Sequence, residues 1–491
     1  MNEQSLPLSV LDTYAPPQPE KADALLKQAL AGQRDKIVVI DDDPTGVQTV
    51  HGIHVYTDWT DQSILEGFEE ENRMFFLLTN SRSMTQKETR EVHEQIARGV
   101  MKASRATGKP FVIISRSDST LRGHFPLETE TLRREIERAG GQPYDGEILC
   151  PFFCEGGRYT LGNVHYVKEG DRLVPAGQTE FARDRSFGYT HSRLDEWCEE
   201  KTAGAYPASE TTCIPLEMLR RLDVDGVAQL LDGVKGFRKV VVNAAAYEDV
   251  KVFLAGYLKA CAAGKRFMFR TAAVVPKLLG GVADRPLLTR EELVNGHSQN
   301  GGLIVAGSHV QKTTDQLAEL TAGLADLEQI EFHVSRALED GGLQAEAARV
   351  RALAEASLRA GRDTLVYTSR KRMDVAGLDK EQQLKLSVDI SNAVTSVVAE
   401  LGIQPAFIVA KGGITSSDIG VRALRVRRAL VMGQIAPGVP VWRTDGESKF
   451  PYMPYVIFPG NVGDRTTLLQ VVRRLRAMSP LYDEFLKSQE D

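Results

Sequence analysis

The chain has 491 residues, enough for about three average domains or two large ones, and its 42% hydrophobic and 26% charged residues are typical of a soluble globular protein. The net charge of -6 argues against a nucleic-acid surface, which would carry a basic excess. No apolar run reaches the roughly 18–20 residues that cross a bilayer, and the first residues lack the basic and apolar segments of a signal peptide. We therefore expect a cytoplasmic protein with neither a membrane nor a nucleic-acid partner.

The first 35 residues are predicted to be an N-terminal extension. Its proline-rich first 20 residues are expected to be loosely attached, and residues 21–33 have the periodicity of a helix. From residue 37 onward, short apolar runs alternate with amphipathic runs, and this alternation predicts a mostly parallel sheet covered by helices. The predicted strands are Ile37–Ile40, Met74–Thr79 and Phe111–Ser115, and the predicted helices are Gln86–Ala106 and Leu127–Ala139.

The alternation continues through a further strand-like run at Gly146–Phe153. Short alternating strands with glycine-rich turns between Gly157 and Asp184 predict a hairpin insertion. Residues 281–301 contain no long apolar run and are predicted to be a domain boundary, after which the βα pattern resumes. We therefore predict an α/β fold of two α/β domains with mostly parallel sheets, over residues 36–285 and 300–480.

Five cysteines in a chain of this length are typical of reduced thiols. Cys150 and Cys154 have a C-x3-C spacing, but no second pair of cysteines or histidines completes a zinc site. We expect both to pack as apolar side chains, and we assign no metal-ligating residues.

Three consecutive aspartates, Asp41, Asp42 and Asp43, follow the apolar run Ile37–Ile40. Because ligands of open α/β sheets bind beyond the carboxyl ends of the strands, this run delivers the carboxylates to the functional edge. A carboxylate there can act as a general base on a hydroxyl, or can hold a polyol or Mg²⁺. The alternative is an aspartate-rich turn that only caps the next segment. Because an apolar strand leads directly into the three aspartates, we favour the interpretation that these carboxylates belong to a functional site.

Two further strand ends carry polar clusters. The second predicted strand is followed by Asn80, Ser81, Arg82 and Ser83, and the third by Arg116, Asp118, Ser119, Thr120, Arg122 and Gly123. Arginines present a planar fork that suits carboxylates and phosphates, and hydroxyls can bond to sugar hydroxyls. A helix cap with solvated arginines would explain either cluster alone. Three such strand ends together favour a shared site for a polar, anionic substrate.

Three glycine turns follow strands in the C-terminal half. They contain Gly307 and Ser308, then Gly412, Gly413, Ile414 and Thr415, then Gly460, Asn461 and Gly463. Glycines after a strand let the backbone approach a phosphate, and the N-terminus of the following helix supplies N–H groups. Each turn alone is also an ordinary connection, but three in one domain favour a nucleotide site. The Walker A sequence, the protein-kinase motifs and the dinucleotide glycine fingerprint are all missing, which predicts a less common kinase family.

These motifs together resemble the four-carbon acid sugar kinase family, formerly a domain of unknown function. The family's D-D-x-T-G turn is matched by Asp42 to Gly46, its T-R-S segment loosely by Ser81 to Ser83, and its K-x-D-S-T-x-R-G segment by Arg116 to Gly123, with arginine in place of lysine. Its G-R-x-T-x-x-G stretch is matched by Gly157 to Gly162, and its G-S, G-G-x-T and G-N-x-G segments by the three glycine turns. The resemblance runs in order from about residue 36 to about residue 475.

The resemblance implies a substrate-binding domain over residues 36–285, a nucleotide-binding domain over residues 300–480 and an active site in the cleft between them. It implies phosphorylation by ATP and Mg²⁺ of the terminal hydroxyl of a short sugar acid, such as threonate, erythronate or a 3-oxo-tetronate, in carbohydrate catabolism. A homodimer is left open. The expected catalytic residues are Asp43 and Asp42, and either Arg82 or Arg122 is expected to hold the substrate carboxylate. The other expected substrate-binding residues are Ser81, Asp118, Ser119, Thr120 and Arg158, and those expected to bind nucleotide are Ser308, Gly412, Gly413, Ile414, Thr415, Gly460, Asn461 and Gly463.

The chain also departs from the family pattern. Pro44 replaces an aromatic or apolar residue in the first turn, Arg270–Pro276 replaces a G-S-A-G-x-A segment, Ile414 stands where glutamate is common, and the lysine that often precedes the G-N turn is absent. A non-catalytic member that binds a sugar acid or a nucleotide is therefore kept as an alternative. A dehydrogenase or isomerase of acid sugars is the other alternative, against which the missing dinucleotide fingerprint argues.

Overall fold

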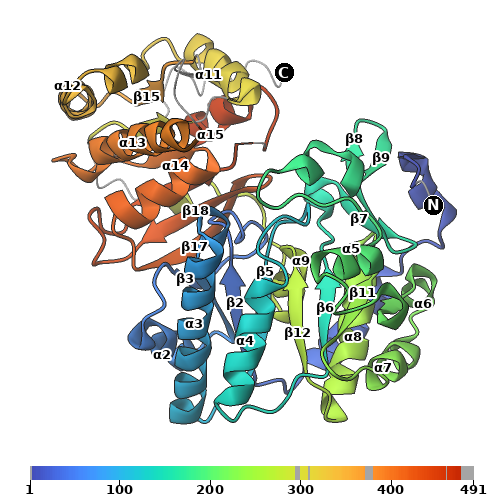
Figure 1. Ribbon diagram of the computed structural model, residues 1–491. Helices are drawn as coiled ribbons and strands as arrows, with labels where there is room; N and C mark the ends of the chain where they lie inside the picture. The colour runs from blue at the N-terminus through green and yellow to red at the C-terminus, as the bar shows by residue number, and fades with distance from the viewer. Residues whose placement is uncertain (1–2, 294–298, 308–309, 371–379, 461, 477–491) are drawn as a thin grey trace. The chain divides into compact units, whose positions relative to one another are not determined.

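The computed structural model describes residues 3–293, 299–307, 310–370, 380–460 and 462–476. The chain separates into two compact units, residues 1–284 and 285–491 (Figure 1). In each unit, helices pack against a sheet that is mostly parallel. This confirms the predicted fold class of two α/β domains with mostly parallel sheets.

The N-terminal unit contains an open sheet in which neighbouring strands are all parallel. Parallel strands joined by helices are what the βα alternation of the sequence predicts. In spatial order the strands are β10 (Thr212–Ile214), β11 (Arg238–Val242), β6 (Gly146–Cys150), β12 (Phe267–Thr271), β5 (Phe111–Arg116), β2 (Lys36–Asp41), β4 (Met74–Leu78) and β3 (Ile53–Tyr56).

The strand β2 is buried along its whole length because both faces of the sheet are covered. Val38 and Ile40 on one face pack into an apolar cluster with α2 (Asp61–Glu69), α3 (Gln86–Thr107) and α4 (Leu127–Arg138). Helices α3 and α4 lie side by side over this face (Figure 1). The strand therefore fixes the position of Asp41, its last residue, and of the point where Asp42 and Asp43 leave the sheet.

Residues 3–20 are anchored to the N-terminal unit, so the prediction that this segment is loosely attached is wrong. β1 (Leu6–Pro7) pairs antiparallel with β9 (Arg172–Pro175), and the guanidinium of Arg220 donates to the carbonyl of Ala15 at 2.6 Å. Helix α1 (Pro19–Leu30) follows and packs against α8 (Tyr247–Ala262). The apolar side chains of this segment pack against the core; these are Leu6, Leu8, Val10, Leu11 and Tyr14.

The predicted hairpin insertion between Gly157 and Asp184 is confirmed. β7 (Arg158–Leu161) and β8 (Val164–Glu169) are antiparallel, and β9 continues this small sheet on the other side of β8. The insertion positions Arg158 at the start of β7.

The C-terminal unit contains a mixed sheet with a parallel core. In spatial order its strands are β17 (Arg428–Ala436), β18 (Val439–Thr444), β19 (Pro454–Phe458), β16 (Ile408–Lys411), β13 (Leu303–Ala306), β15 (Thr364–Thr368) and β14 (Glu328–Phe332). The first two pairs are antiparallel and the others parallel. Its helices are α10 (Arg290–Leu293), α11 (Gln311–Gly323), α12 (Gly342–Arg359), α13 (Lys380–Ala399), α14 (Gly413–Asp418) and α15 (Thr467–Leu475).

Candidate active site

The carboxyl edge of the N-terminal sheet gathers the polar clusters predicted from the sequence. Asp41, the last residue of β2, is in register with Leu78 of β4 and Arg116 of β5. Because these three strands are parallel neighbours, the segments that follow them leave from the same edge. The aspartates, Arg82, Asp118 and Arg122 therefore meet, although they lie up to about 80 residues apart in the chain.

The loop after β2 is a tight turn built on the aspartates themselves. The carboxylate of Asp43 accepts hydrogen bonds from the backbone N–H of Thr45 at 2.8 Å and from its hydroxyl. The backbone N–H of Asp43 donates to the carboxylate of Asp41 at 3.2 Å. The backbone at Gly46 then passes close to the carboxylate of Asp41: a β-carbon at Gly46 would lie 1.8 Å from Oδ2 of Asp41. The turn therefore requires glycine at this position for space.

Gly46→Ala should misplace the aspartates and lower kcat/KM for the substrate by about a hundredfold, the size of effect that a displacement of about 1 Å has at a reacting centre. The matched control is Gly233→Ala, because a β-carbon at Gly233 meets only one carbonyl oxygen at 3.5 Å, an ordinary contact. Steady-state kinetics and Tm of both variants check the prediction. Wild-type kinetics for Gly46→Ala would show that the turn tolerates movement of Asp41.

Arg82 and Arg116 are the cations that neutralise this acidic loop: Nη1 of Arg116 lies 3.2 Å from Oδ1 of Asp41 and 3.7 Å from Oδ1 of Asp42, and Arg82 approaches from the next strand end. Arg82 lies in a short helical turn, Ser81–Ser83, which begins after Asn80 in a left-handed backbone conformation (φ 55°). Its Nη2 lies 2.6 Å from Oδ2 of Asp43, its Nε 3.3 Å from Oδ2 of Asp42, and its Nη1 3.6 Å from Oδ1 of Asp118. Burial alone would lower the pKa of Arg82, but these carboxylates raise it above its usual value.

The three aspartates differ in how tightly they hold a proton. Burial raises the pKa of Asp42 to about 7, because attraction to Arg82 and Arg116 offsets only part of the desolvation. Burial likewise raises the pKa of Asp41 to about 6. Burial would also raise the pKa of Asp43, but Arg82, Arg116 and the hydrogen bonds from Thr45 outweigh it and lower the pKa. Neither carboxylate oxygen of Asp42 accepts a hydrogen bond from the described residues. Asp41 accepts hydrogen bonds from the Asp43 N–H and from Arg116, so Asp42 is the carboxylate with both a pKa near neutral and free acceptor oxygens.

Arg122 already has an acidic partner. Its Nε donates to Oδ2 of Asp118 at 2.8 Å and its Nη2 to Oδ1 at 3.3 Å, while its Nη1 lies 3.9 Å from Oδ2 of Asp184. The guanidinium also lies over the ring of Phe181, 5.2 Å from its centroid. Arg82 and Arg122 therefore both have much of their charge balanced within the protein.

Arg158 differs from these two arginines. Among the described residues its side chain has no hydrogen bond and no ion pair; the guanidinium lies over the Phe181 ring at 5.6 Å, and its Nε is buried without a partner. Burial lowers the pKa of Arg158, and the attraction of Asp118 opposes that shift only in part. A partly buried guanidinium without an anion has spare capacity to bind one.

The predicted hydroxyls mostly hold the loops in place. Ser81 is fully buried and donates to Oε1 of Glu128 at 2.5 Å. Thr120 is buried, its hydroxyl donates to Asp118, and its carbonyl accepts from the hydroxyl of Tyr189 at 2.7 Å. Ser119 is half-buried, and its carbonyl interacts with Nε2 of His165 at 2.8 Å.

Two charged residues beneath the site were not selected from the sequence. Nη1 of Arg270, in β12, lies 3.2 Å from Oε2 of Glu128, and its Nη2 donates to the carbonyl of Arg122 at 3.2 Å. A β-carbon at Gly123 (φ 119°) would lie 3.2 Å from Nη2 of Arg270 and 3.3 Å from Oδ2 of Asp42. An arginine directly after the apolar run Phe267–Phe269 was the available signal for Arg270. Glu128 lies within the charged first turn of α4 and had no distinguishing signal.

The carboxyl edge of the C-terminal sheet gathers the glycine turns. Lys411, the last residue of β16, is in register with Ala306 of β13 and Phe458 of β19, so the turns that follow these strands are neighbours. Gly412 has φ 117°, which favours glycine, and it precedes the first residue of α14.

The predicted nucleotide-binding residues lie at or near these turns. A β-carbon at Gly307 would lie 2.4 Å from Oγ1 of Thr415, so the first two turns touch. Gly413 begins α14, and Gly463 (φ 80°) lies against Thr467. The side chain of Ile414 is 70% exposed, and a β-carbon at Gly460 would meet open space. Ser308 and Asn461 lie outside the described residues.

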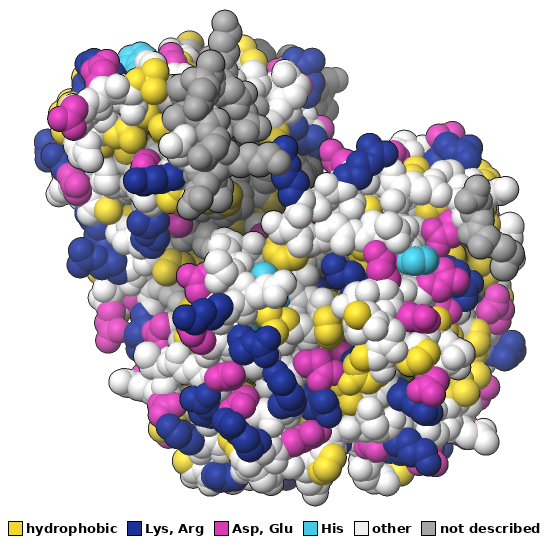
Figure 2. Space-filling view, viewed as in Figure 1, with side chains coloured by type: hydrophobic (Ala, Val, Ile, Leu, Met, Phe, Trp, Pro, Cys, Tyr) yellow, Lys and Arg dark blue, Asp and Glu magenta, His cyan; other side chains and the backbone are white. Residues whose placement is uncertain are grey.

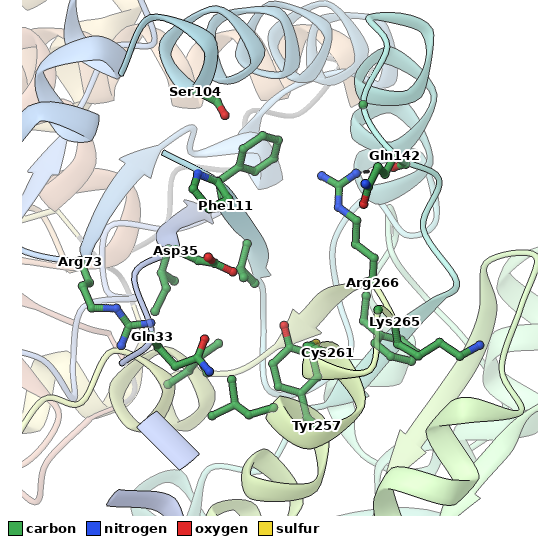
Figure 3. A pocket seen from close by; sticks show the side chains of 18 of the residues that line it. Gln33, Asp35, Arg73, Ser104, Phe111, Gln142, Tyr257, Cys261, Lys265 and Arg266 are labelled. Atoms are coloured by element: carbon green, nitrogen blue, oxygen red, sulfur yellow. Dashed lines mark hydrogen bonds between the residues drawn. The ribbon is translucent and has the colours of Figure 1, made fainter. Parts of the chain in front are cut away.

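A separate pocket lies at the opposite edge of the N-terminal sheet, where β2, β5 and β12 begin. Its volume is about 440 Å³, and Arg73, Tyr257 and Arg266 are among the residues that line it (Figure 3). None of the predicted site residues is part of this pocket. The predicted catalytic groups thus lie at the carboxyl edge, where α/β sheets bind ligands.

The described surface has no large single-sign region on the face in view, where basic and acidic side chains are interspersed (Figure 2). Within the described ranges, no helix combines the length and apolarity needed to span a membrane.

Comparison with known proteins identifies both units. A model of a sugar-binding N-terminal domain matches residues 37–279, and a model of a nucleotide-binding C-terminal domain matches residues 303–468. A search of curated proteins found no match.

Solved structures show a similar fold. A Haemophilus influenzae protein of the DUF1537 family is 16% identical, with a TM-score of 0.59, and the match covers 89% of this chain and 100% of that one. A Salmonella typhimurium LT2 protein, whose description proposes a tRNA synthase, is 16% identical, with a TM-score of 0.62, and the match covers 90% of this chain and 100% of that one. At this identity the likeness concerns the fold alone. The two matched domains and their order show that the chain belongs to the family with the architecture of the four-carbon acid sugar kinases, a sugar-binding domain followed by a nucleotide-binding domain.

Proposed function

We propose that this protein transfers the γ-phosphate of ATP to the terminal hydroxyl of a short sugar acid. The observation that carries the proposal is a pair of groups with spare binding capacity in the sugar-binding domain: Asp42, whose carboxylate accepts no hydrogen bond from the described residues and whose pKa is about 7, and Arg158, whose guanidinium has no anion within ion-pair distance among them. Asp118 links them, because it lies 3.6 Å from Arg82, the partner of Asp42, and attracts Arg158. A base and a free cation together suit a molecule that carries both a hydroxyl and a carboxylate.

Arg158 binds the substrate carboxylate in this proposal. The sequence alone favoured Arg82 or Arg122, but each of these already lies against protein carboxylates. A charge-assisted bond to a planar guanidinium is directional, so it would fix the acid end of the substrate. The ring of Phe181, beneath both Arg122 and Arg158, keeps the two guanidinium planes in place.

Asp42 accepts the proton of the attacking hydroxyl. A general base works best when its pKa lies near the working pH, and the pKa of Asp42 is about 7. Asp43 stays ionised and holds Arg82 through the 2.6 Å contact. Phosphoryl transfer depends mostly on positioning and on neutralising charge, so the rigid loop after β2 contributes as well as the base.

The glycine turns of the C-terminal unit fit the phosphates of a nucleotide. Gly307 has no room for a side chain, Gly412 has a positive φ, and the buried amine of Lys411 lies beside them. The backbone can thus approach a phosphate closely, as the first turn of α14 begins there.

Mg²⁺ would accompany the nucleotide. Among the described residues, no group of three or more histidine, cysteine, aspartate or glutamate side chains could hold a metal alone. Mg²⁺ suits such a site, because it binds mainly to substrate phosphates, waters and one or two carboxylates. Asp464, which follows Gly463, is the carboxylate that the glycine turns supply. When bound, Mg²⁺ neutralises charge on the transferred phosphate.

The pH dependence of kcat/KM should report the Asp42 carboxyl. Asp42 must be deprotonated to act as a base, so kcat/KM for the sugar acid, measured at saturating MgATP, should rise about tenfold per pH unit below pH 7 and level off above it. Rate measurements between pH 5 and 9 check this, with the coupling enzymes in excess at each pH. A profile that stays flat through pH 7 would contradict the assignment of Asp42.

The function itself is tested by ADP release with Mg-ATP against a panel of acids: D- and L-threonate, D- and L-erythronate, their 3-oxo forms and branched relatives. Polyols of the same length without a carboxylate are the matched controls. We expect turnover on one or a few acids and little on the polyols. Nucleotide binding without turnover on any acid would instead support the non-catalytic alternative. Ile414, an exposed apolar residue at the second glycine turn where the family commonly has glutamate, is the feature that agrees with that alternative.

A further inference from the structure

Lys411 is a fully buried lysine at the centre of the glycine turns. It ends β16, its side chain has no exposed surface, and its strand neighbours Ala306 and Phe458 each lead into another turn. Lysines are almost never fully buried unless a carboxylate pairs with them. Among the described residues, no carboxylate lies within ion-pair distance of Lys411.

The hydrogen bonds of Lys411 fit a neutral amine. Its Nζ donates to the carbonyl of Pro459 at 2.8 Å and to the carbonyl of Gly460 at 3.3 Å, and it lies 4.0 Å from the centroid of the Phe458 ring. A neutral amine has two hydrogens, and these two carbonyls accept both. An ammonium group has three, and the third would have only the weak attraction of the Phe458 ring and no oxygen or nitrogen acceptor among the described residues. Burying such a charge is unfavourable.

The charged groups on the surrounding elements do not stabilise a protonated Lys411. On α11, Lys312 repels Lys411, and Asp315 accepts a bond from Gln311. On α14, Asp418 accepts a bond from Ser391 and lies 3.7 Å from Arg422. After β19, Asp464 accepts bonds from Thr466 and Thr467. Burial, followed by the repulsion from Lys312, lowers the pKa of Lys411 to about 7.

We propose that Lys411 is neutral in the free protein and takes up one proton from solvent when the phosphates of a nucleotide bind beside Gly412 and Gly413. The proposal rests on the proposed nucleotide site. Phosphate charges stabilise an ammonium strongly at short range in a buried environment, where the effective dielectric constant is low. The protonated amine then ties the Gly460 turn to the bound phosphates. Nucleotide affinity therefore falls as the pH rises.

Calorimetric titration with MgADP at pH 8, in buffers of different ionisation enthalpy, measures the proton uptake directly. The phosphates of ADP are already ionised at this pH, because the second pKa of a phosphate is about 6. Wild-type protein should take up close to one proton per ADP, and Lys411→Met close to none. Lys449→Met is the matched control, because Lys449 also donates to a carbonyl, that of Ala399, and lies over a ring, that of Phe450, but away from the turns. It should behave as the wild type does.

A second measurement needs only the wild-type protein, so it stands even where Lys411→Met fails to fold. Its MgADP affinity should fall by up to about tenfold for each pH unit above 7. Binding with neither proton uptake nor this slope would overturn the role of Lys411 and leave the nucleotide site intact. No binding of MgADP would overturn the nucleotide site together with this inference.

Discussion

Asp42→Asn should lower kcat on the sugar acid by about 10²- to 10⁴-fold, the usual contribution of a general base, while MgATP binding stays near the wild-type value. Asparagine keeps the shape of the side chain but cannot accept the proton of the attacking hydroxyl. The fold should persist, because Arg82 keeps its 2.6 Å contact with Asp43 and its contact with Asp118. Turnover, nucleotide affinity and Tm together check this prediction.

Asp43→Asn is the matched control, because it alters the neighbouring carboxylate of the same loop. Asp43 holds Arg82 and accepts both bonds from Thr45, so its loss should disturb the loop and lower Tm as well as activity. The decisive difference is the pH profile. Asp43→Asn should retain the rise of kcat/KM with pH below pH 7, and Asp42→Asn should lose that rise. If instead Asp43→Asn removes this rise of kcat/KM and Asp42→Asn keeps it, Asp43 is the base.

Arg158→Met should raise KM for the sugar acid by about 10- to 100-fold, which corresponds to the loss of one charge-assisted hydrogen bond. KM for ATP and the Tm should change little, because the side chain of Arg158 has no hydrogen bond or ion pair among the described residues. Methionine keeps much of the packing against Phe181. Steady-state kinetics with each substrate varied in turn separate the two KM values.

Two comparisons sharpen the test of Arg158. Arg158→Lys keeps the charge but loses the planar fork, so its KM should lie between those of the wild type and Arg158→Met. Arg122→Met should lower Tm as well, because it leaves Asp118 without its 2.8 Å partner. An unchanged KM for the acid in Arg158→Met would contradict this role of Arg158 and would indicate that Arg82 or Arg122 binds the substrate carboxylate.

The strand ends of the N-terminal sheet could be predicted from the sequence because their signal is local. The apolar runs that become β2, β4 and β5 each end in a polar cluster, and parallel neighbours present such ends at one edge. The same reasoning found the glycine turns after β13, β16 and β19.

The roles within these clusters could not be predicted, because they depend on burial and on partners distant in sequence. Asp42 and Asp43 are adjacent, yet Arg82 and Thr45 bind Asp43 more closely and leave Asp42 with a raised pKa. Arg158 stands out only because Arg82 and Arg122 lie against acidic side chains.

Three further features depended on packing that periodicity does not encode. Glu128 reaches the site from α4, Lys411 lies buried among the glycine turns, and the N-terminal residues pack through Leu6 to Tyr14 in spite of their prolines. Proline-rich composition suggested loose attachment because it reports the lack of regular structure, whereas attachment depends on the apolar side chains between the prolines.

Transfer of the labelled γ-phosphate of ATP to a sugar acid tests the central claim most directly, because it distinguishes a kinase from an enzyme that only hydrolyses ATP. We predict label on the terminal hydroxyl of at least one short sugar acid, with loss of that label in Asp42→Asn. Label found only in inorganic phosphate, or no release of label from ATP at all with any acid of the panel, would contradict the proposed function.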